Sequence, residues 1–315
     1  SNVQDGRRAE VVLEDDGGHR VLFVDYAGAE TGVDWRRNSR YRFANCRVQC
    51  TNRSQHVSLA PSKKTEITEV GPTGHETKLL FIGDTHVGRT RHPKQNGTRI
   101  DPVAAFARAA EVAVERGVDG VVHAGDLFHD TDDYGLAAEV DSRVLTPLAE
   151  HGIPFYYVTG NHGHDVRDAL LDGSHLGRLE QLGADGKSIN GTVRLCGVDH
   201  PDSGGRPLSN YRFPRTPDEP FTILVIHRTI KQLPLNDTGT DLDDISGGPV
   251  TGFDLVVAGH NHDSREEKWD GGEGFYTGAA AHMSTNLDPT DGLAWLVTVC
   301  CGSSERDKVQ LTDAR

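Results

Sequence analysis

The sequence predicts an α/β (α+β) protein, a sandwich of two mixed sheets flanked by helices and preceded by a small all-β domain. In residues 1–70, hydropathy alternates as it does in strands, and no helical period is visible. From Lys78 onward, continuous apolar runs of the kind buried in a sheet alternate with helical segments. The last third of the chain consists mostly of further apolar runs. This order of elements favours sheets packed in layers with helices beside them.

The all-β domain is expected to span residues 1–70. Gly, Asn and Ser separate its strand-like runs, which are "EVVLED", "HRVLFVDYA", "RYRFANCRVQCT", "HVSLAP" and "TEITEV". Residues 71–77 contain Gly and Pro, which are typical of a linker. The second domain is therefore expected to comprise residues 78–315.

The second domain is predicted to begin with the strand "KLLFIGD". A helix follows, because Asp101 and Pro102 supply an N-cap and a first-turn proline, and an apolar stripe then continues toward Gly117. Next come the strand "DGVVHAGD", a helix from Tyr134 to His151 and the strand "PFYYVTGNHGHD". Later strands are expected at "TVRLCGV", "FTILVIH", "FDLVVAGHNH", "GFYTGAA" and "LAWLVTV".

The composition, with 36% hydrophobic and 25% charged residues, is that of a globular protein. No apolar run approaches the roughly 18 residues that span a bilayer, and no signal peptide opens the sequence. A cytoplasmic location and no membrane partner are therefore expected. The five cysteines are odd in number and lie in apolar contexts, which favours buried free thiols over disulfides or a thiolate zinc site.

Charge is distributed unevenly along the chain, whose formal net charge is −14. Residues 1–77 hold 11 basic and 11 acidic residues, so the negative balance lies in residues 78–315. Residues 35–65 contain eight basic residues and no acidic one, with aromatic residues between them. Arginines around aromatic strand residues suit base stacking above a positively charged groove. The candidate nucleic-acid-binding residues are Trp35, Arg36, Arg37, Arg40, Tyr41, Arg42, Phe43 and Arg47.

The strand spacing of the first domain resembles that of OB-folds of the single-strand-binding type. This resemblance implies a partner that is single-stranded DNA or RNA. The alternative interpretation is a solvated basic face on a small barrel without a nucleic-acid partner.

In the second domain, side chains with oxygen or nitrogen ligand atoms follow five successive predicted strands. Open α/β sheets carry their ligand sites at these carboxyl ends. A lone histidine in such a place is usually a structural residue, but a whole set at five strand ends is not explained in that way. The candidate ligands are Asp84, His86, Asp126, Asn161, His227, His260 and His262.

Two aspartates, one asparagine and four histidines suit Mn²⁺, Fe²⁺, Ni²⁺ or Zn²⁺ better than Ca²⁺. Seven ligands are too many for one ion that must keep an open position. They suit two ions that share a carboxylate, and such two-metal sites clamp the attacking and leaving oxygens of an in-line displacement at phosphorus. The sequence therefore predicts a site for two divalent ions.

The motifs D-x-H, G-D, G-N-H, H and G-H-x-H occur in this order over residues 84–262 and resemble those of the calcineurin-like metallophosphoesterases. Within that family, "GDLFHD" and "DTHVG" with its following basic loop are similar to the nuclease subunit of SbcCD-type DNA repair complexes. "GDLFHD" lacks the Arg-Gly pair of the phosphoprotein phosphatases. The resemblance implies the metallophosphoesterase sandwich and two metal ions, with manganese favoured and iron, nickel or zinc as alternatives.

The resemblance also implies a division of the ligands. Asp84, His86 and His262 would hold one ion. Asn161, His227 and His260 would hold the second, and Asp126 would bridge the two.

Two further histidines have implied roles in catalysis. His162 would stabilise the pentacovalent phosphorus or protonate the leaving oxygen, while a water or hydroxide that bridges the metals attacks. His129 matches an additional histidine of the nuclease branch and would position the scissile phosphate. Its alternative role is that of a polar residue at a helix start.

The chain departs from the family pattern in two places. The acid that usually follows the G-N-H motif is displaced, since "GNHGHD" has Gly163 and His164 before Asp165. The 53 residues after His262 are predicted to form closing strands and not the DNA-binding cap of the repair nucleases.

The favoured function is a two-metal phosphodiesterase that cuts single-stranded DNA or RNA, guided by the OB-like domain, and a protein partner is compatible with it. A phosphoesterase for nucleotides or dinucleotides is the alternative. A scaffold protein with an inactive catalytic domain is disfavoured because no predicted ligand is missing.

Overall fold

The structure is a computed structural model of the 315-residue chain. It describes side chains in residues 76–90, 100–163, 179–201, 210–211, 213, 221–233, 239–242, 253–269, 272–281, 292–300 and 302–311, and six backbone strands before residue 73. The chain divides into two compact units, Ser1–Gly74 and His75–Arg315.

The described strands of the first unit form one mixed sheet and one antiparallel pair. A four-stranded sheet has the order β1-β2-β5-β4, in which β2 and β5 are parallel, and β3 pairs antiparallel with β6. The expected OB-like barrel and the side chains of the candidate nucleic-acid-binding residues lie outside what the structure describes. The strands are β1 (Ala9–Glu14), β2 (Arg20–Asp25), β3 (Ser39–Ala44), β4 (Arg47–Cys50), β5 (Val57–Ala60) and β6 (Glu66–Pro72).

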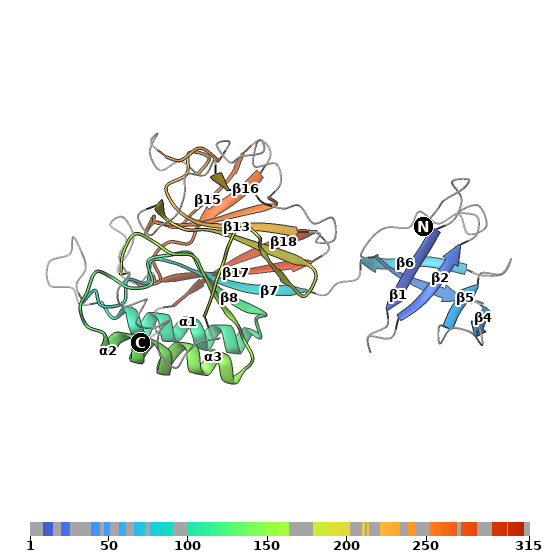
Figure 1. The fold of residues 1–315 in the computed structure, drawn as a ribbon, viewed down its shortest axis with the longest axis horizontal. Coiled ribbons are helices and arrows are strands. Elements are labelled where there is room, and N and C mark those ends of the chain that lie inside the picture. The colour runs from blue at the N-terminus through green and yellow to red at the C-terminus, as the bar shows by residue number, and fades with distance from the viewer. Residues whose placement is uncertain are drawn as a thin grey trace. The chain divides into compact units, whose positions relative to one another are not determined.

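The described residues of the second unit form two mixed sheets, as predicted, and each sheet has six strands (Figure 1). The first has the order β10-β9-β8-β7-β17-β18, with the four strands from β10 to β7 parallel and β17 and β18 antiparallel to their neighbours. Its strands are β7 (Thr77–Ile82), β8 (Gly120–His123), β9 (Phe155–Tyr157), β10 (Leu179–Gln181), β17 (Leu293–Cys300) and β18 (Ser303–Gln310).

The second sheet has the order β11-β12-β13-β14-β16-β15, with parallel strands in the centre and an antiparallel strand at each edge. Four strands, β10, β11, β15 and β18, were not expected from the sequence. All four are at sheet edges and carry polar residues, so no apolar run marks them. The strands of this sheet are β11 (Lys187–Ile189), β12 (Val193–Val198), β13 (Phe221–His227), β14 (Leu255–Gly259), β15 (Arg265–Trp269) and β16 (Gly272–Tyr276).

Helix α1 (Pro102–Arg116) begins and ends where its capping residues predict. The Asp101 carboxylate accepts a hydrogen bond from the Ala104 N–H, and Gly117 ends the helix at φ 58°. The second predicted helix is one helical stretch with a π-helical segment between α2 (Gly135–Val140) and α3 (Thr146–Glu150). Pro147 explains the wider turn, because it lacks an N–H and its ring would crowd the carbonyl one turn earlier.

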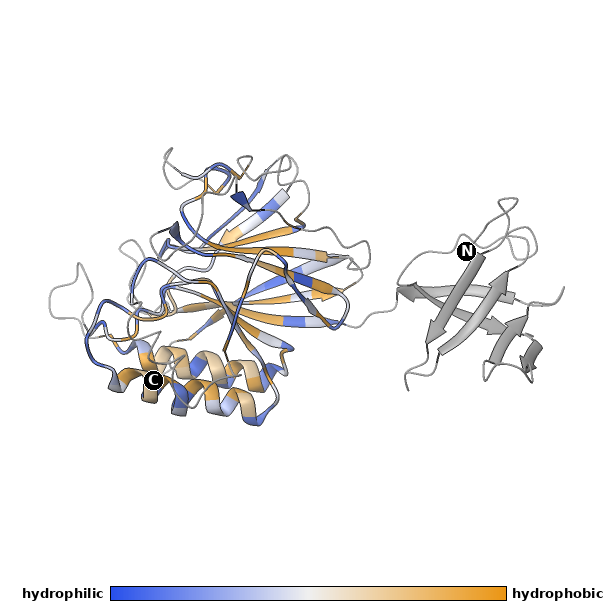
Figure 2. Cartoon of the chain, viewed as in Figure 1, coloured by the Kyte–Doolittle hydropathy of each residue, from blue (hydrophilic) through white to orange (hydrophobic). Residues whose placement is uncertain are grey.

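The helices cover one face of the first sheet, and the other face of that sheet packs on the second sheet (Figure 1). Successive residues of β7 point to opposite faces of the first sheet. Leu80 and Ile82 face the helices, whereas Leu79 and Phe81 lie in the core between the sheets. The central strands of both sheets are largely apolar, as burial on two faces requires (Figure 2). None of the helices in the described part of the chain is long and apolar enough to cross a membrane.

Candidate metal centre

The loops after β7, β8 and β9 of the first sheet meet the loops after β13 and β14 of the second. The Asp84 N–H donates to the Gly125 carbonyl at 3.0 Å, which joins the first two loops. The His227 imidazole, at the end of β13, donates through Nδ1 to the Ala124 carbonyl at 2.6 Å and so joins the two sheets. The predicted strand ends are therefore brought to one place.

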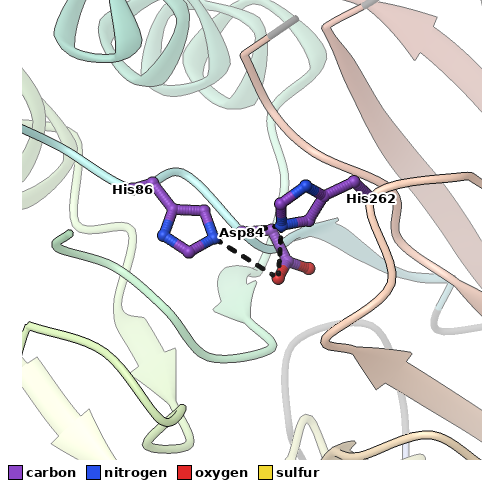
Figure 3. A group of neighbouring side chains, drawn as sticks. All are labelled: Asp84, His86 and His262. Carbon is purple, nitrogen blue, oxygen red and sulfur yellow. Dashed lines mark hydrogen bonds and ion pairs between the residues drawn. The ribbon is translucent and has the colours of Figure 1, made fainter. Parts of the chain in front are cut away.

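Asp84, His86 and His262 form the first cluster (Figure 3). Nε2 of His86 lies 3.9 Å from Oδ1 of Asp84, and Nε2 of His262 lies 3.7 Å from the same oxygen. The two Nε2 atoms are 3.1 Å apart. One carboxylate oxygen and two imidazole nitrogens thus face a common point, which is the donor set that a divalent transition metal takes.

Asp84, Asp126 and His227 form a second cluster of converging ligand atoms. Oδ2 of Asp126 lies 3.3 Å from Nε2 of His227 and 3.5 Å from Nε2 of His86. Asp126 therefore stands between histidines of both clusters, as a shared carboxylate must. Asp84 belongs to both clusters, whereas the sequence assigned it as a ligand of one ion only.

Asn161 and His260 adjoin the second cluster. Oδ1 of Asn161 lies 3.0 Å from Nδ1 of His260, and the His260 ring stands at 79° to the ring of His227, with centroids 5.2 Å apart. All seven candidate ligands therefore gather at the same edge of the two sheets.

Four of the candidate ligands have a left-handed backbone. The φ angles of Asp84, His86, Asp126 and His260 are 49°, 43°, 54° and 79°. A non-glycine residue in this region costs roughly 1–3 kcal/mol, and such strain gathers at functional sites. Hydrogen bonds stabilise this left-handed backbone, since the His86 N–H donates to the Asp126 carbonyl and the His260 N–H donates to Oδ2 of Asp84.

Two glycines of the motifs are required by close approach. A Cβ on Gly160 would collide with the Asp126 carboxylate, and a Cβ on Gly125, whose φ is 99°, would collide with the His227 ring. Glycine in the G-D and G-N-H motifs therefore lets the backbone pass directly behind the ligands.

Four of the candidate ligands, Asp84, His86, Asp126 and His227, are buried, and burial affects their ionisation. Burial raises the pKa of Asp84 to about 7 and lowers that of His86 to about 2. Burial also opposes ionisation of Asp126, but the hydrogen bond and positive charge of His227 hold its pKa below the usual range. The centre thus combines an ionised Asp126 carboxylate with a neutral His86 imidazole, the forms in which these groups bind metals.

Buried polar atoms without a hydrogen-bond partner among the described residues point into this centre. They include Oδ1 of Asp84, which is fully buried. An unsatisfied buried polar atom costs about 1–3 kcal/mol. Nδ1 of His227 is occupied by the Ala124 carbonyl, so Nε2 keeps its lone pair for a cation. The residues present therefore fit divalent metal ions.

His162 lies at the rim of the centre. Its N–H donates to Oδ1 of Asp126 at 2.9 Å, and its ring centroid is 5.4 Å from that of His86. Nδ1 of His162 lies 2.7 Å from Oδ2 of Asp130, whose other oxygen accepts the Gly163 N–H at 3.0 Å.

Asp130 was missed from the sequence. The displaced acid, Asp165, lies outside the described residues, and the carboxylate that meets the histidine in the described structure comes from another loop. The available signal was the last residue of "GDLFHD", four positions after Asp126.

His129 lies beside His86 and His162, and its ring centroid is 5.5 Å from each of theirs. Its Nδ1 is buried and has no hydrogen-bond partner among the described residues. Burial lowers the pKa of His129 and favours the neutral ring. The structure therefore brings the two candidate catalytic histidines together.

A second missed residue, His123, supports the loops from inside the core. Its Nδ1 accepts the Gly125 N–H at 3.2 Å, so its Nε2 carries the proton and donates to Thr85 Oγ1 at 3.0 Å. The Thr85 hydroxyl then donates to the Leu127 carbonyl at 2.7 Å. This chain ties the loop of Asp84 to the loop of Asp126. Within an apolar strand, a histidine gives no sequence signal for such a role.

The sandwich of mixed sheets and the two clusters at its edge define a metallophosphoesterase domain with a dinuclear metal centre. The family model of the calcineurin-like phosphoesterases matches residues 77–264, and the chain belongs to this family. The resemblance drawn from the motifs is therefore confirmed.

Among curated proteins, the chain is similar to the DNA double-strand break repair protein Mre11 of Haloferax volcanii, with 31% identity over 216 residues, which are 67% of this chain and 47% of that protein. It is 34% identical over 189 residues to Mre11 of Halobacterium salinarum, covering 59% of this chain and 47% of that protein. The matched region spans about half the length of these relatives. Among solved structures, a dimetal phosphatase from Danio rerio aligns with 75% of this chain and 99% of its own, at a TM-score of 0.45 and 12% identity.

Proposed function

We propose that this protein is a metal-dependent phosphodiesterase that hydrolyses nucleic-acid strands. The observation that carries the proposal is the pair of ligand clusters at one edge of the two sheets, where the Asp126 carboxylate lies 3.5 Å from His86 of the first cluster and 3.3 Å from His227 of the second. Two divalent ions in such a site supply Lewis-acid stabilisation of a phosphoryl group and activation of water. Manganese is the proposed metal.

Each ligand has a proposed place. Asp84, His86 and His262 hold one ion, and Asn161, His227 and His260 hold the other, with Asp126 between them. The left-handed turns at four of these residues fix the ligand atoms before any ion binds, so little reorganisation accompanies binding.

His162 is the proposed proton donor to the leaving oxygen. The Asp130 carboxylate accepts a hydrogen bond from Nδ1–H of His162, which leaves Nε2 of the ring to face the reacting phosphate. His129, beside both His86 and His162, is the proposed contact to the scissile phosphate.

Nucleic acid is the proposed substrate because the curated relatives are DNA repair proteins and because residues 35–65 supply a cluster of positive charge. The interleaved aromatic residues favour single strands over duplexes. We further propose that residues 1–70 form the nucleic-acid-binding domain and residues 78–315 the catalytic domain. The acidic balance of residues 78–315 supports a second candidate, a phosphoesterase for nucleotides or dinucleotides.

An assay of labelled single-stranded and duplex DNA and RNA, beside bis-p-nitrophenyl phosphate, separates these functions. With Mn²⁺ we expect cleavage of single strands and of the small diester, and with a chelator we expect none. Hydrolysis of the small diester without cleavage of any oligonucleotide would favour the second candidate. Oligonucleotide cleavage that persists in chelator would contradict both.

A further inference from the structure

A cavity of about 420 Å³ opens beside the metal centre on the side of His260. Its walls come from residues 200–201, 228–229 and 239–240 together with His260. This volume lies within the range of small-molecule sites, which is about 300–1,000 Å³. It has room for a single nucleotide and not for a duplex.

His260 is a wall of the cavity and a neighbour of the metal centre at once. Its Nδ1 lies 3.0 Å from Asn161 Oδ1, and its ring stacks on the His200 ring with centroids 5.7 Å apart and planes at 25°. His200 is itself fixed by the hydrogen bond from its N–H to the Thr159 carbonyl at 3.0 Å. A group bound in the cavity is therefore separated from a phosphate at the metal centre only by the His260 side chain.

Arg228 supplies the positive charge of the cavity. It directly follows the candidate ligand His227, is 7% exposed, and its Nη2 donates to the Asp199 carbonyl at 3.2 Å. The carboxylate of Asp199 accepts the Thr159 N–H at 2.7 Å and the Gln181 amide at 2.8 Å, which fixes this part of the wall. A buried guanidinium binds phosphate oxygens strongly and in a fixed geometry.

The threonines of the cavity wall are joined by backbone hydrogen bonds. The Thr240 N–H donates to the Thr229 carbonyl at 2.8 Å, and the Lys231 N–H donates to the Thr240 carbonyl at 3.0 Å. A Cβ on Gly239 would lie 2.8 Å from the Lys231 nitrogen, so the segments approach as closely as glycine permits. The two threonines add hydroxyl groups that bind phosphate or sugar oxygens.

We propose that this cavity is a nucleotide subsite in which Arg228 binds the phosphate next to the scissile phosphodiester. The inference rests on the proposed function and adds a specificity to it. Substrates with a second phosphate beside the cleaved bond are preferred over isolated phosphodiesters.

Three thymidine dinucleotides test this specificity: one without a terminal phosphate, one with a 5′-phosphate and one with a 3′-phosphate. With the full chain and Mn²⁺, we expect kcat/KM for one phosphorylated dinucleotide to exceed that for the unphosphorylated one by about tenfold or more, the effect of one charge-assisted hydrogen bond. The readout is the ratio of the two kcat/KM values within each variant, so a variant with less folded protein keeps a meaningful ratio. Arg228→Gln should reduce the ratio to about one, and Arg228→Lys should retain part of it.

Arg143→Gln is the matched control, because Arg143 is an exposed arginine that pairs with Glu139 on the helical side of the unit, and its ratio should equal that of the wild type. Equal hydrolysis of all three dinucleotides by the wild type, or an undiminished preference in Arg228→Gln, overturns the subsite. Calorimetric binding of thymidine 3′,5′-bisphosphate decides the inference even where nothing is hydrolysed. Binding about tenfold weaker in Arg228→Gln supports it, and equal binding overturns it, whereas absent hydrolysis of every substrate overturns the proposed function.

Discussion

Nδ1 of His162 lies 2.7 Å from Oδ2 of Asp130, although 32 residues separate them in the chain. The Gly163 N–H and then His162 hold the pKa of Asp130 below its usual range, so Asp130 is an ionised acceptor. The proton between the two groups therefore resides on Nδ1. Nε2, the other nitrogen of the ring, is the one available for the reacting phosphate.

Replacement of this acceptor should slow turnover without releasing metal. We expect Asp130→Asn to lower kcat by about 10- to 100-fold, the range found for partners that orient a functional histidine. The side chain of Asp130 is 66% exposed, so folding should be unaffected. Asp132→Asn, in the same loop, is the control, and an equal loss in both variants would contradict the orienting role.

The second prediction concerns His162 itself. His162→Ala should keep the full metal content, because the residue is not a proposed ligand, and should lower kcat by about 10²- to 10⁴-fold. Metal content is measured by elemental analysis after desalting. Loss of one ion per chain would show that His162 binds metal.

Metal affinity should depend on pH through Asp84, whose pKa burial raises to about 7. Below that pH, Asp84 is protonated in the metal-free protein, and metal binding must displace the proton. The apparent affinity for Mn²⁺ should therefore fall by about tenfold for each pH unit below 7 and level off above it. Calorimetry in buffers of different ionisation enthalpy measures the released proton directly. An affinity that is constant across this interval would contradict the assignment of Asp84 as a ligand.

The fourth prediction addresses the basic segment of the first unit. Substituting Arg40, Arg42 and Arg47 by Gln should weaken binding of single-stranded oligonucleotides. It should also make binding less dependent on salt. In a plot of log binding constant against log salt concentration, the slope should become shallower by about 0.7 for each phosphate that an arginine no longer neutralises. Tyr41→Ala should instead cost about 1–3 kcal/mol for a stacked base with little change in slope. Binding is measured by fluorescence anisotropy over a series of salt concentrations. Unchanged binding in both variants would support the nucleotide phosphoesterase instead.

Much of the fold and of the site followed from local signals. The strand β7 is an apolar run followed by Asp84, and α1 has both its capping residues. Each element can therefore be predicted from its local sequence alone. The seven candidate ligands were found because they follow strands whose parallel packing brings their ends together.

The features that were missed depend on contacts between distant residues. The edge strands β15 and β18 are held by pairing and contain few apolar residues. The bond between Asp130 and His162 joins two loops, and Asp84 enters both clusters because its backbone turns left-handed at the strand end. The cavity at Arg228 joins segments from three separate loops. No local pattern predicts these contacts themselves.

The central claim is a dinuclear centre whose ions share Asp126, and metal counting in one variant tests it most directly. The wild type should bind two Mn²⁺ per chain, measured by calorimetry together with elemental analysis. Asp126→Asn should weaken both binding events and abolish hydrolysis, because one carboxylate neutralises both ions. Binding of a single ion by the wild type, or two ions and near-full activity in Asp126→Asn, would contradict it.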